Sequence, residues 1–554
     1  MYQQIYDPVG HSLGWSSLVA ALPLVLLFVL LGGLKVQAWL ASLAAVALAL
    51  VLAVAVWGMP WQQAGLSATE GGFFGLFPIV WILVNAIWLY NMTVATGHAG
   101  ILRRSFAGVS DDRRVQAIVI AFCFGALMEA LAGFGTPVAI SAVMLIAIGM
   151  RPLLAATVSL VANTAPVAYG AIATPIITLS GVTGISTDDL GSLVGRQTPI
   201  LAAFVPFALL AIVDGRRGLR EAWPAALVSG VGFGAAQFVA SNYISVQLTD
   251  IIASLVSAAC VVGLLRVWTP GAPVTVRRPA PAGPPRIAGG ASDDPAEAEA
   301  VLGRGPADPP GEVARAYAPY LIIIAVFSIA QVTAVKEWLN KATKMFHWPG
   351  LHVVNSSGKP VSSVTFTFSF FTYAGTLLLI AGLLSMFALR ARPAAALASY
   401  LKTLSDLRFA IITIVLVLAF AYVLNQSGMT ITLGRWMAQA GGAFAIISPI
   451  LGWLGVAVTG SDTSSNALFG ALQITAAKGA GLSPTLLAAA NSSGGVLGKM
   501  ISPQNLAVAS AAIGMSGREG DIFRRVVGWS LLFTALMCVL VWLQSTAVLS
   551  WMVV

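Results

Sequence analysis

The chain has 554 residues, of which 58% are hydrophobic and 9% charged, and its mean hydropathy is +0.87. Soluble domains carry about 25% charged residues, so this composition excludes a soluble protein and indicates a polytopic membrane protein. The net charge of +9 does not indicate nucleic-acid binding, because the basic residues fall in loops on one predicted side of the membrane. The three cysteines lie in apolar runs without metal-ligand spacing, so we expect no disulfide framework, metal site or cofactor.

Helical membrane spans require roughly 20 apolar residues. The N-terminus lacks the basic start of a signal peptide, so the first apolar run is expected to be an uncleaved span. The sequence predicts twelve spans, near residues 16–34, 36–57, 72–97, 152–180, 198–214, 219–240, 246–268, 316–334, 366–389, 407–426, 483–511 and 527–549.

Two further apolar regions, 115–149 and 441–478, are each interrupted in the middle. The interruptions read LAGFGTP (131–137) and TGSDTSSNA (459–467), and the arms beside them are short. Two short arms around a glycine-rich or polar tip favour a re-entrant hairpin, whose irregular backbone is tolerated only where it is buried in protein or lines a wet cavity. Two thin full spans in each region are the alternative, which would leave the orientation of the other spans unchanged.

Basic residues predict the orientation of the spans. They fall in alternate loops on one face, which the positive-inside rule places in the cytoplasm, with both termini outside. The loop 335–365 carries four lysines on the outer side and departs from this pattern. Residues 269–315 hold ten of the 28 prolines with mixed charges, and this composition predicts a disordered cytoplasmic linker.

The two halves of the chain share a motif. NTAPVAYGAIATP (163–175) aligns with NSSGGVLGKMISP (491–503), with an asparagine, a glycine and a Thr-Pro or Ser-Pro pair at equal spacing. Counting back 28 residues from either asparagine reaches a predicted hairpin tip, at Gly135 or Thr463. On the predicted topology the hairpins enter from opposite sides, so we expect inverted repeats at 1–214 and 316–554, joined by spans in 215–268 and the linker.

Inverted repeats with paired broken helices are typical of secondary transporters. A helix interrupted at mid-membrane exposes unpaired N–H groups that favour an anion, while proline stops a helix and glycine lets the backbone approach a ligand. The sequence therefore predicts an all-α transporter in which two hairpin tips and two broken helices, 152–180 and 483–511, converge. Packing by small residues is the alternative explanation of either motif alone.

Glu129, Asp462 and Lys499 are the ionisable residues expected deep within the membrane. Each costs about 2.5–3.5 kcal/mol at a helix centre, or on the order of 8–10 kcal/mol together, so a functional role is expected. Lys499 is predicted to anchor a substrate carboxylate. The alternatives are an internal ion pair with Asp462 or Glu129, a proton-coupling role, and snorkelling. Glu129 is predicted to carry a proton, with a structural acid as the alternative, whereas Asp462 is expected to bind a proton, cap a helix near Thr463 or ligate sodium.

The polar and glycine residues of the tips and breaks complete the predicted binding site. Asn, Ser and Thr side chains supply neutral hydrogen bonds to a substrate, and core packing is the alternative for Tyr169. The predicted substrate-binding residues besides Lys499 are Gly135, Thr136, Asn163, Thr164, Tyr169, Ser464, Ser465, Asn466, Asn491, Ser492 and Ser493.

Three segments resemble the L-lactate permease family of bacterial inner membranes. They are MEALAGFGTPVAI (128–140), GSDTSSNALFGALQ (460–473) and NSSGGVLGKMISPQNLAVA (491–509), and the resemblance covers nearly the whole chain except the linker. It implies uptake of L-lactate, and often D-lactate or glycolate, in symport with protons. It also implies scaffold and transport domains, an elevator-like motion and, often, a homodimer. The expected partners are thus a small carboxylate and membrane lipid.

Three other functions remain as alternatives. A sodium-coupled carboxylate transporter of the same fold is disfavoured because Lys499 supplies a cation where sodium would bind. An intramembrane aspartyl protease is disfavoured because TGSD (459–462) has serine where that motif needs glycine, and no second aspartate follows a tyrosine within a span. An anion channel would not accumulate its substrate against a gradient.

Overall fold

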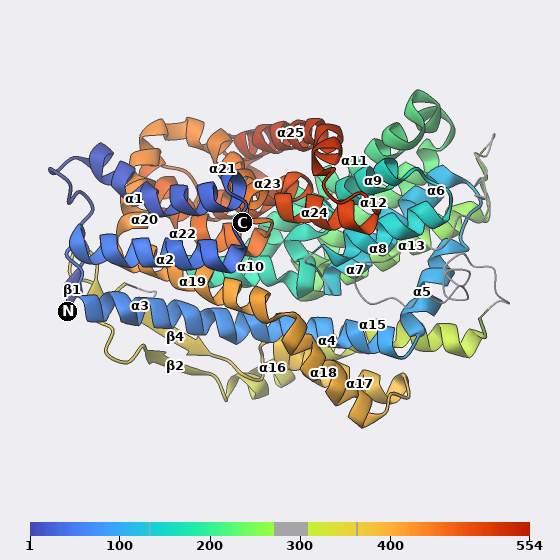
Figure 1. Cartoon of the computed structure of the whole chain (residues 1–554), viewed down its shortest axis with the longest axis horizontal. Coiled ribbons are helices and arrows are strands. Elements are labelled where there is room, and N and C mark those ends of the chain that lie inside the picture. Colours follow the sequence, from blue (N-terminus) through green and yellow to red (C-terminus); the bar gives the residue numbers. More distant parts are fainter. Residues whose placement is uncertain (132, 134, 271–307, 362–363) are drawn as a thin grey trace.

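The computed structural model describes residues 1–131, 133, 135–270, 308–361 and 364–554, and this part of the chain is predominantly helical. Eleven of its helices are long and apolar enough to cross a membrane, or twelve if one bent pair counts as a span. Most of the helices run along the long axis of the molecule (Figure 1). The protein is therefore a multi-pass membrane protein.

The first half of the chain, up to the connecting segment, is built from short and long helices in sequence. Its elements are β1 (Tyr2–Gln3), α1 (Leu13–Phe28), η1 (Val29–Gly33), α2 (Ala38–Ala55), α3 (Trp61–Phe74), η2 (Gly75–Val80), α4 (Trp81–Ala95), α5 (His98–Ala107), α6 (Arg113–Ala117), η3 (Ile118–Phe124), α7 (Gly125–Leu131), α8 (Thr136–Ala147), α9 (Pro152–Ala162), η4 (Val167–Tyr169), α10 (Gly170–Thr183), α11 (Thr187–Glu221), α12 (Trp223–Val239), η5 (Ala240–Ile244), η6 (Val246–Leu248) and α13 (Thr249–Leu265).

The second half adds two short strand pairs outside the helices, in which β1 pairs with β3 and β2 with β4. Its elements are α15 (Pro310–Gln331), α16 (Thr333–Asn340), β2 (Lys344–His347), β3 (Val353–Val354), β4 (Thr365–Phe368), α17 (Ala374–Ala388), α18 (Pro393–Asp406), α19 (Arg408–Ser427), α20 (Met429–Met437), η8 (Ala438–Ala443), α21 (Phe444–Thr459), α22 (Asp462–Ala480), α23 (Pro484–Gly498), η9 (Lys499–Ile501), α24 (Pro503–Ala512), α25 (Glu519–Gln544) and η10 (Ser550–Met552).

Several predicted boundaries differ from the structure. The predicted span 366–389 begins as β4, and its helix α17 starts only at Ala374, because the aromatic residues before it belong to a strand pair. The predicted linker 269–315 ends too late, since α15 begins at Pro310; its residues 271–307 lie outside the described part of the chain. The first arm of hairpin 115–149 is continuous over Arg113–Leu131 and is itself long enough to span.

Serine and proline together start two helices of the second half, α23 and α24. Ser483 accepts a hydrogen bond from the backbone of Leu486, and Ser502 accepts one from Asn505, both at 3.3 Å. In each case proline is the next residue, where its missing N–H costs nothing. Local sequence therefore sets the points at which α23 and α24 begin.

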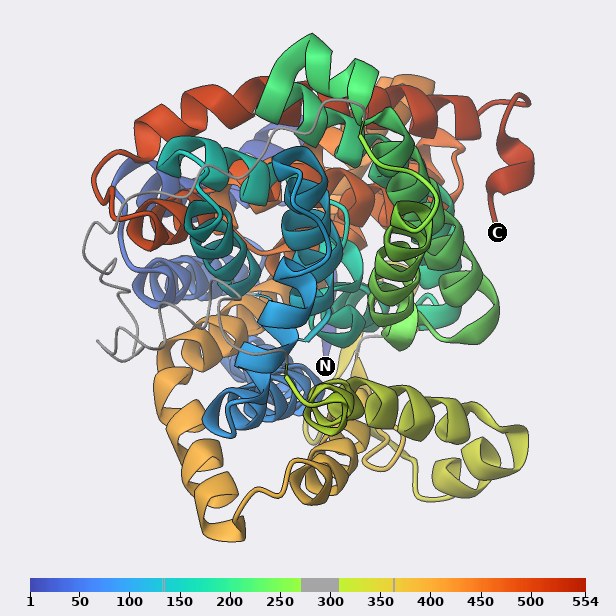
Figure 2. The same ribbon diagram turned by 90° about the vertical axis from the view of Figure 1, so that its right-hand side faces the viewer.

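The helices form two groups. One contains α3, α4, α5 and α15 to α19, in which α19 packs on α3 and α17 on α4 and α15. The other contains α6 to α13 and α21 to α25, in which α21 packs on α23 and α11 on α12. In Figure 2 the helices α15, α17 and α18, coloured yellow-green to orange, lie at the bottom, while α11 to α13 in green and α25 in red lie in the upper part.

The packing within the second group repeats between the halves of the chain. Helix α8 packs on α24, and its counterpart α22 packs on α10. Likewise α11, which follows the first broken helix, packs on α23, and α25, which follows the second, packs on α9. Such reciprocal contacts are what an internal two-fold relation between the repeats would produce.

Candidate functional site

A small polar cavity lies where the two hairpin tips and the two broken helices meet. The cavity is open to one side and has a volume of about 40 Å³. Residues from all four elements line it, namely Glu129, Gly133, Val167, Gly170, Ala171, Thr174, Pro175, Gly460, Ser461, Asp462, Thr463 and Lys499. All three ionisable residues predicted within the membrane therefore reach one cavity.

The first broken helix leaves regular geometry over a long stretch. Helix α9 ends before Asn163, and the axes of the flanking helices differ by 66°. Ala171, Ile172 and Ala173 take left-handed backbone conformations, with φ values of 44°, 57° and 56°. Because such residues cost of order 1–2 kcal/mol each, the surrounding structure holds this stretch in place, and it turns Ala171 and Thr174 to the cavity wall.

The second break is shorter and lies later in the motif. Helix α23 continues through Asn491 to Gly498, Lys499 begins a 3₁₀ turn, and Ser502 is extended before α24 begins. Asn491 therefore lies inside a helix, whereas its counterpart Asn163 lies at the start of the first break. The aligned motifs thus share spacing but differ in backbone conformation.

Lys499 and Glu129 form an ion pair across the cavity. Their side chains are 8% and 3% exposed, so the pair is almost completely buried. The amide of Asn163 donates to the other oxygen of Glu129 at 3.0 Å, and Gly170 packs against the same carboxyl group. Of the alternatives for Lys499, snorkelling is excluded by this burial and by the pairing with a carboxylate in the protein interior.

Asp462 is the first residue of α22 and is held by one oxygen. Ser492 donates to its Oδ2 at 2.6 Å and Asn466 at 3.3 Å. Its Oδ1 has no hydrogen-bond partner in the described structure. The prediction that Asp462 caps this helix is wrong, because Ser461 is the capping residue and accepts from the backbone of Ser464 at 3.3 Å. Asp462 is thus free of a capping role.

Behind Asp462, several of the predicted polar residues form a buried network with one another. Asn491 donates to Asn466 at 2.9 Å, and Asn466 donates to Ser492 at 3.2 Å and to the carbonyl of Pro175 at 3.1 Å. Gln473, which we did not single out from the sequence, donates to Asn491 at 3.2 Å. These residues do not line the cavity; they join α22 and α23 to the first broken helix and position Asp462.

Other predicted binding residues point elsewhere. Ser465 donates to the carbonyl of Gly452 at 3.1 Å, Ser493 to Gln197 at 2.7 Å, and Tyr169 to the carbonyl of Gly191 at 2.7 Å. Gly135 has a φ of 83° and lies against Asn505 and Val508 of α24, next to Thr136 at the start of α8. In this structure these residues are structural neighbours of the site rather than its lining.

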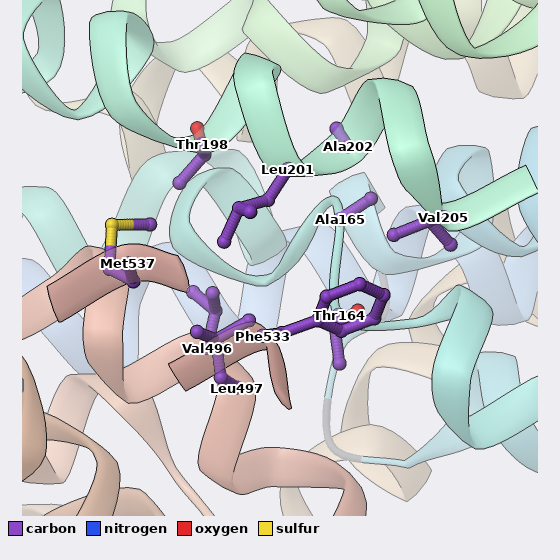
Figure 3. Close-up of a pocket in the computed structure, with 10 residues that line it drawn as sticks. All are labelled: Thr164, Ala165, Thr198, Leu201, Ala202, Val205, Val496, Leu497, Phe533 and Met537. Atoms are coloured by element: carbon purple, nitrogen blue, oxygen red, sulfur yellow. The ribbon is translucent and has the colours of Figure 1, made fainter. Parts of the chain in front are cut away.

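Thr164 lines a second, apolar pocket. Figure 3 shows this pocket between α11, α23 and α25, with Thr164 and Ala165 of the first break on one wall. The remaining residues are almost all hydrophobic, and they are Thr198, Leu201, Ala202, Val205, Val496, Leu497, Phe533 and Met537. Thr164 itself donates to the carbonyl of Val161 at 2.7 Å, so it does not face the polar cavity.

Besides Asp112, which is paired with Arg114, two further buried acids were not predicted from the sequence. Glu70 in α3 is 1% exposed and accepts from Gln426 at 2.7 Å, and Asp250 in α13 is 1% exposed and accepts from Gln237 at 3.0 Å. Both side chains are therefore buried inside the protein, as Glu129, Asp462 and Lys499 are. Both acids follow polar stretches that resemble loops in the sequence, which is why they escaped notice.

Among the described residues, no group of three or more His, Cys, Asp or Glu side chains is arranged to hold a metal ion.

Broken helices and hairpin tips around a buried charge pair, in a multi-pass helical protein, are features of a membrane transport protein. Residues 16–548 match the L-lactate permease family model. The chain is 41% identical to the L-lactate permease of Bacillus subtilis over 575 residues and to that of Escherichia coli over 565 residues, with all of each chain covered. It is also 41% identical to the glycolate permease GlcA of Escherichia coli, with 98% of each chain covered. The chain belongs to the L-lactate permease family.

Proposed function

We propose that this protein imports L-lactate, and also D-lactate or glycolate, across the bacterial inner membrane in symport with protons. The substrate class comes from relatives named L-lactate permease and glycolate permease, which match over nearly the whole chain. Proton coupling is supported by the buried Lys499–Glu129 pair, the single observation that carries the proposal.

The ion pair links substrate binding to proton binding. A substrate carboxylate that reaches Lys499 competes with Glu129 for the same ammonium group. Removing the partner of a buried charge costs about 3–5 kcal/mol, so a displaced Glu129 binds a proton instead of remaining charged. One substrate anion and one proton then enter the site together, and Lys499 stays charged throughout.

The neighbouring groups suit a 2-hydroxy acid. Thr174, Ser461 and Thr463 line the cavity and offer hydroxyl groups to the substrate hydroxyl. Asp462 lines the same cavity as Lys499, and its Oδ1 has no hydrogen-bond partner in the described structure, so this acid is the second proposed proton-coupling group. Lys499 thus attracts the substrate carboxylate, while neutral hydroxyl groups bind the substrate hydroxyl.

Transport requires the cavity to open to each side in turn. We assign α3, α4, α5 and α15 to α19 to the scaffold, and the group that holds both hairpins and both broken helices to the mobile part. The inverted relation of the repeats would then supply two equivalent end states. Both termini are placed on the periplasmic side by the distribution of basic residues.

Uptake into proteoliposomes tests this function. With a pH gradient, acidic outside and free of sodium, labelled lactate and glycolate should accumulate, whereas succinate should not. Accumulation that needs sodium would favour the sodium-coupled alternative, and saturable accumulation against a gradient excludes a channel. A symport of one proton and one lactate is electroneutral, so an imposed membrane potential should add nothing; two protons would add about 2.3 kcal/mol per 100 mV.

A further inference from the structure

Asp250 is a buried acid without a role in the site described above. It is the second residue of α13 and is 1% exposed. Its Oδ1 accepts from Gln237 of α12 at 3.0 Å, and its Oδ2 has no hydrogen-bond partner in the described part of the chain. One oxygen of this carboxyl group is therefore buried and unsatisfied.

A chain of hydrogen bonds connects Asp250 to the first broken helix. The amide of Gln237 that donates to Asp250 also donates to the carbonyl of Ala165 at 3.3 Å, and Thr198 donates to the oxygen of Gln237 at 3.3 Å. Ala165 lies two residues after Asn163, which donates to Glu129. The broken stretch thus contacts Glu129 through Asn163 and is linked to Asp250 through Gln237.

The charges around Asp250 leave it without a counter-ion. It lies near the start of α13, which packs on α7, the helix that carries Glu129, and α12 presents the neutral amide of Gln237 to it. Lys499 is paired with Glu129, and no Lys or Arg among the described residues forms an ion pair with Asp250. An ionised Asp250 would be an uncompensated buried charge beside a second carboxylate, which is strongly unfavourable. A protonated Asp250 avoids this cost and turns its unsatisfied Oδ2 into a donor.

We propose that Asp250 is a proton-relay residue that supplies Glu129; the inference rests on the proposed proton symport. When a substrate carboxylate takes Lys499, the O–H bond of Asp250 breaks and a new O–H bond forms on the displaced Glu129 carboxylate. The two carboxyl groups share no hydrogen bond, so the proposed transfer requires a hydrogen-bonded water between them. Asp250, now a carboxylate, regains a proton from the solution that delivered the substrate. The sum is one proton and one anion taken up, with Asp250 restored.

The test uses the full-length protein in proteoliposomes and the variant Asp250→Asn. Asparagine has the shape of a protonated aspartate and keeps an acceptor for Gln237, so this variant is expected to fold. Lactate counterflow at equal pH on both sides should stay within about twofold of wild type, since no net proton transfer is needed. The rate of uptake driven by a pH gradient should fall by about tenfold or more, and Asp250→Glu should restore it in part.

Glu70→Gln is the matched control, because Glu70 is equally buried and also accepts from a glutamine but belongs to the scaffold. It should leave both assays and their pH profiles unchanged. Wild-type rates of gradient-driven uptake in Asp250→Asn would overturn the relay. If Asp250→Asn fails to fold, the pH profile of uptake by Asp250→Glu tests the relay instead. A relay through this carboxyl group predicts a shifted profile, and a profile identical to wild type would refute the relay. Failure of the wild type itself to respond to a pH gradient would instead refute proton symport.

Discussion

Lys499 and Glu129 stand 370 residues apart in the sequence and form one buried ion pair between the second broken helix and the first hairpin. The pair joins the two halves of the chain at the cavity. Asn163 of the first broken helix donates a hydrogen bond to the second oxygen of Glu129. The Glu129 carboxyl group therefore connects the first hairpin with both broken helices. Substrate binding at Lys499 has to break this connection.

Replacement of Lys499 by alanine should weaken lactate binding by about thirtyfold to a few thousandfold, since truncating one member of a buried charge pair costs about 2–5 kcal/mol. Equilibrium binding to the purified protein measures the loss. The variant also leaves the buried Glu129 carboxylate without its ion-pair partner, which lowers stability. The double variant Lys499→Ala, Glu129→Gln therefore serves as the control for stability. It should recover thermal stability without recovering binding, and unchanged affinity in the single variant would refute the anchor role.

Replacement of Glu129 by glutamine should separate exchange from accumulation. Glutamine retains hydrogen bonding toward Lys499 and Asn163 but binds no proton at this position. Lactate-for-lactate exchange in proteoliposomes should therefore persist, while accumulation driven by a pH gradient should be lost. Surviving accumulation would show that Glu129 is a structural acid.

Gly170 should not tolerate alanine. A methyl group at this position would lie 2.9 Å from Oε1 and 3.3 Å from Cγ of Glu129, so it would displace the carboxyl group from Lys499. We expect Gly170→Ala to reduce lactate uptake by about tenfold or more, on the scale of a misplaced functional group, with the protein still folded. Gly528→Ala, whose added methyl group would meet nothing within 4 Å, is the control that should transport normally.

The scaffold offers a matched pair of glycines in one helix. At Gly71 of α3 an added Cβ would lie 2.7 Å from Cβ of Tyr422 and 2.9 Å from Cα of Ala419, so α3 and α19 would have to separate. Gly71→Ala should lower the free energy of unfolding by about 1–3 kcal/mol, the usual cost of overpacking. Gly65→Ala in the same helix meets nothing within 4 Å and should raise stability by about 0.5–1 kcal/mol. Thermal unfolding of both variants in detergent tests this prediction. Equal stabilities of Gly71→Ala and Gly65→Ala would contradict the tight α3–α19 contact.

Composition and spacing determined much of what this chain is. The apolar runs give most of the membrane helices, since a bilayer demands long hydrophobic segments. Ser483-Pro484 and Ser502-Pro503 mark real helix starts, because capping and the proline ring act locally. The matched motifs at Asn163 and Asn491 identified the two broken helices, and the rarity of charge in apolar runs singled out Glu129, Asp462 and Lys499.

Only the tertiary structure decided which of these residues share a cavity and which partner each one takes. Lys499 could pair with either of two acids in the sequence, and in the folded protein it pairs with Glu129. Asp462 instead accepts hydrogen bonds from Ser492 and Asn466. Ser465 and Ser493 have the right chemistry for a binding site, yet helix rotation turns them to a carbonyl and an amide of other helices. Thr164, in the turn after α9, donates instead to the nearby carbonyl of Val161. Asp250 illustrates the same limit, because its burial against Gln237 and the first broken helix depends on contacts between helices that are distant in the chain. Local signals report where a helix starts or stops, whereas the direction of a side chain depends on how the helices pack together.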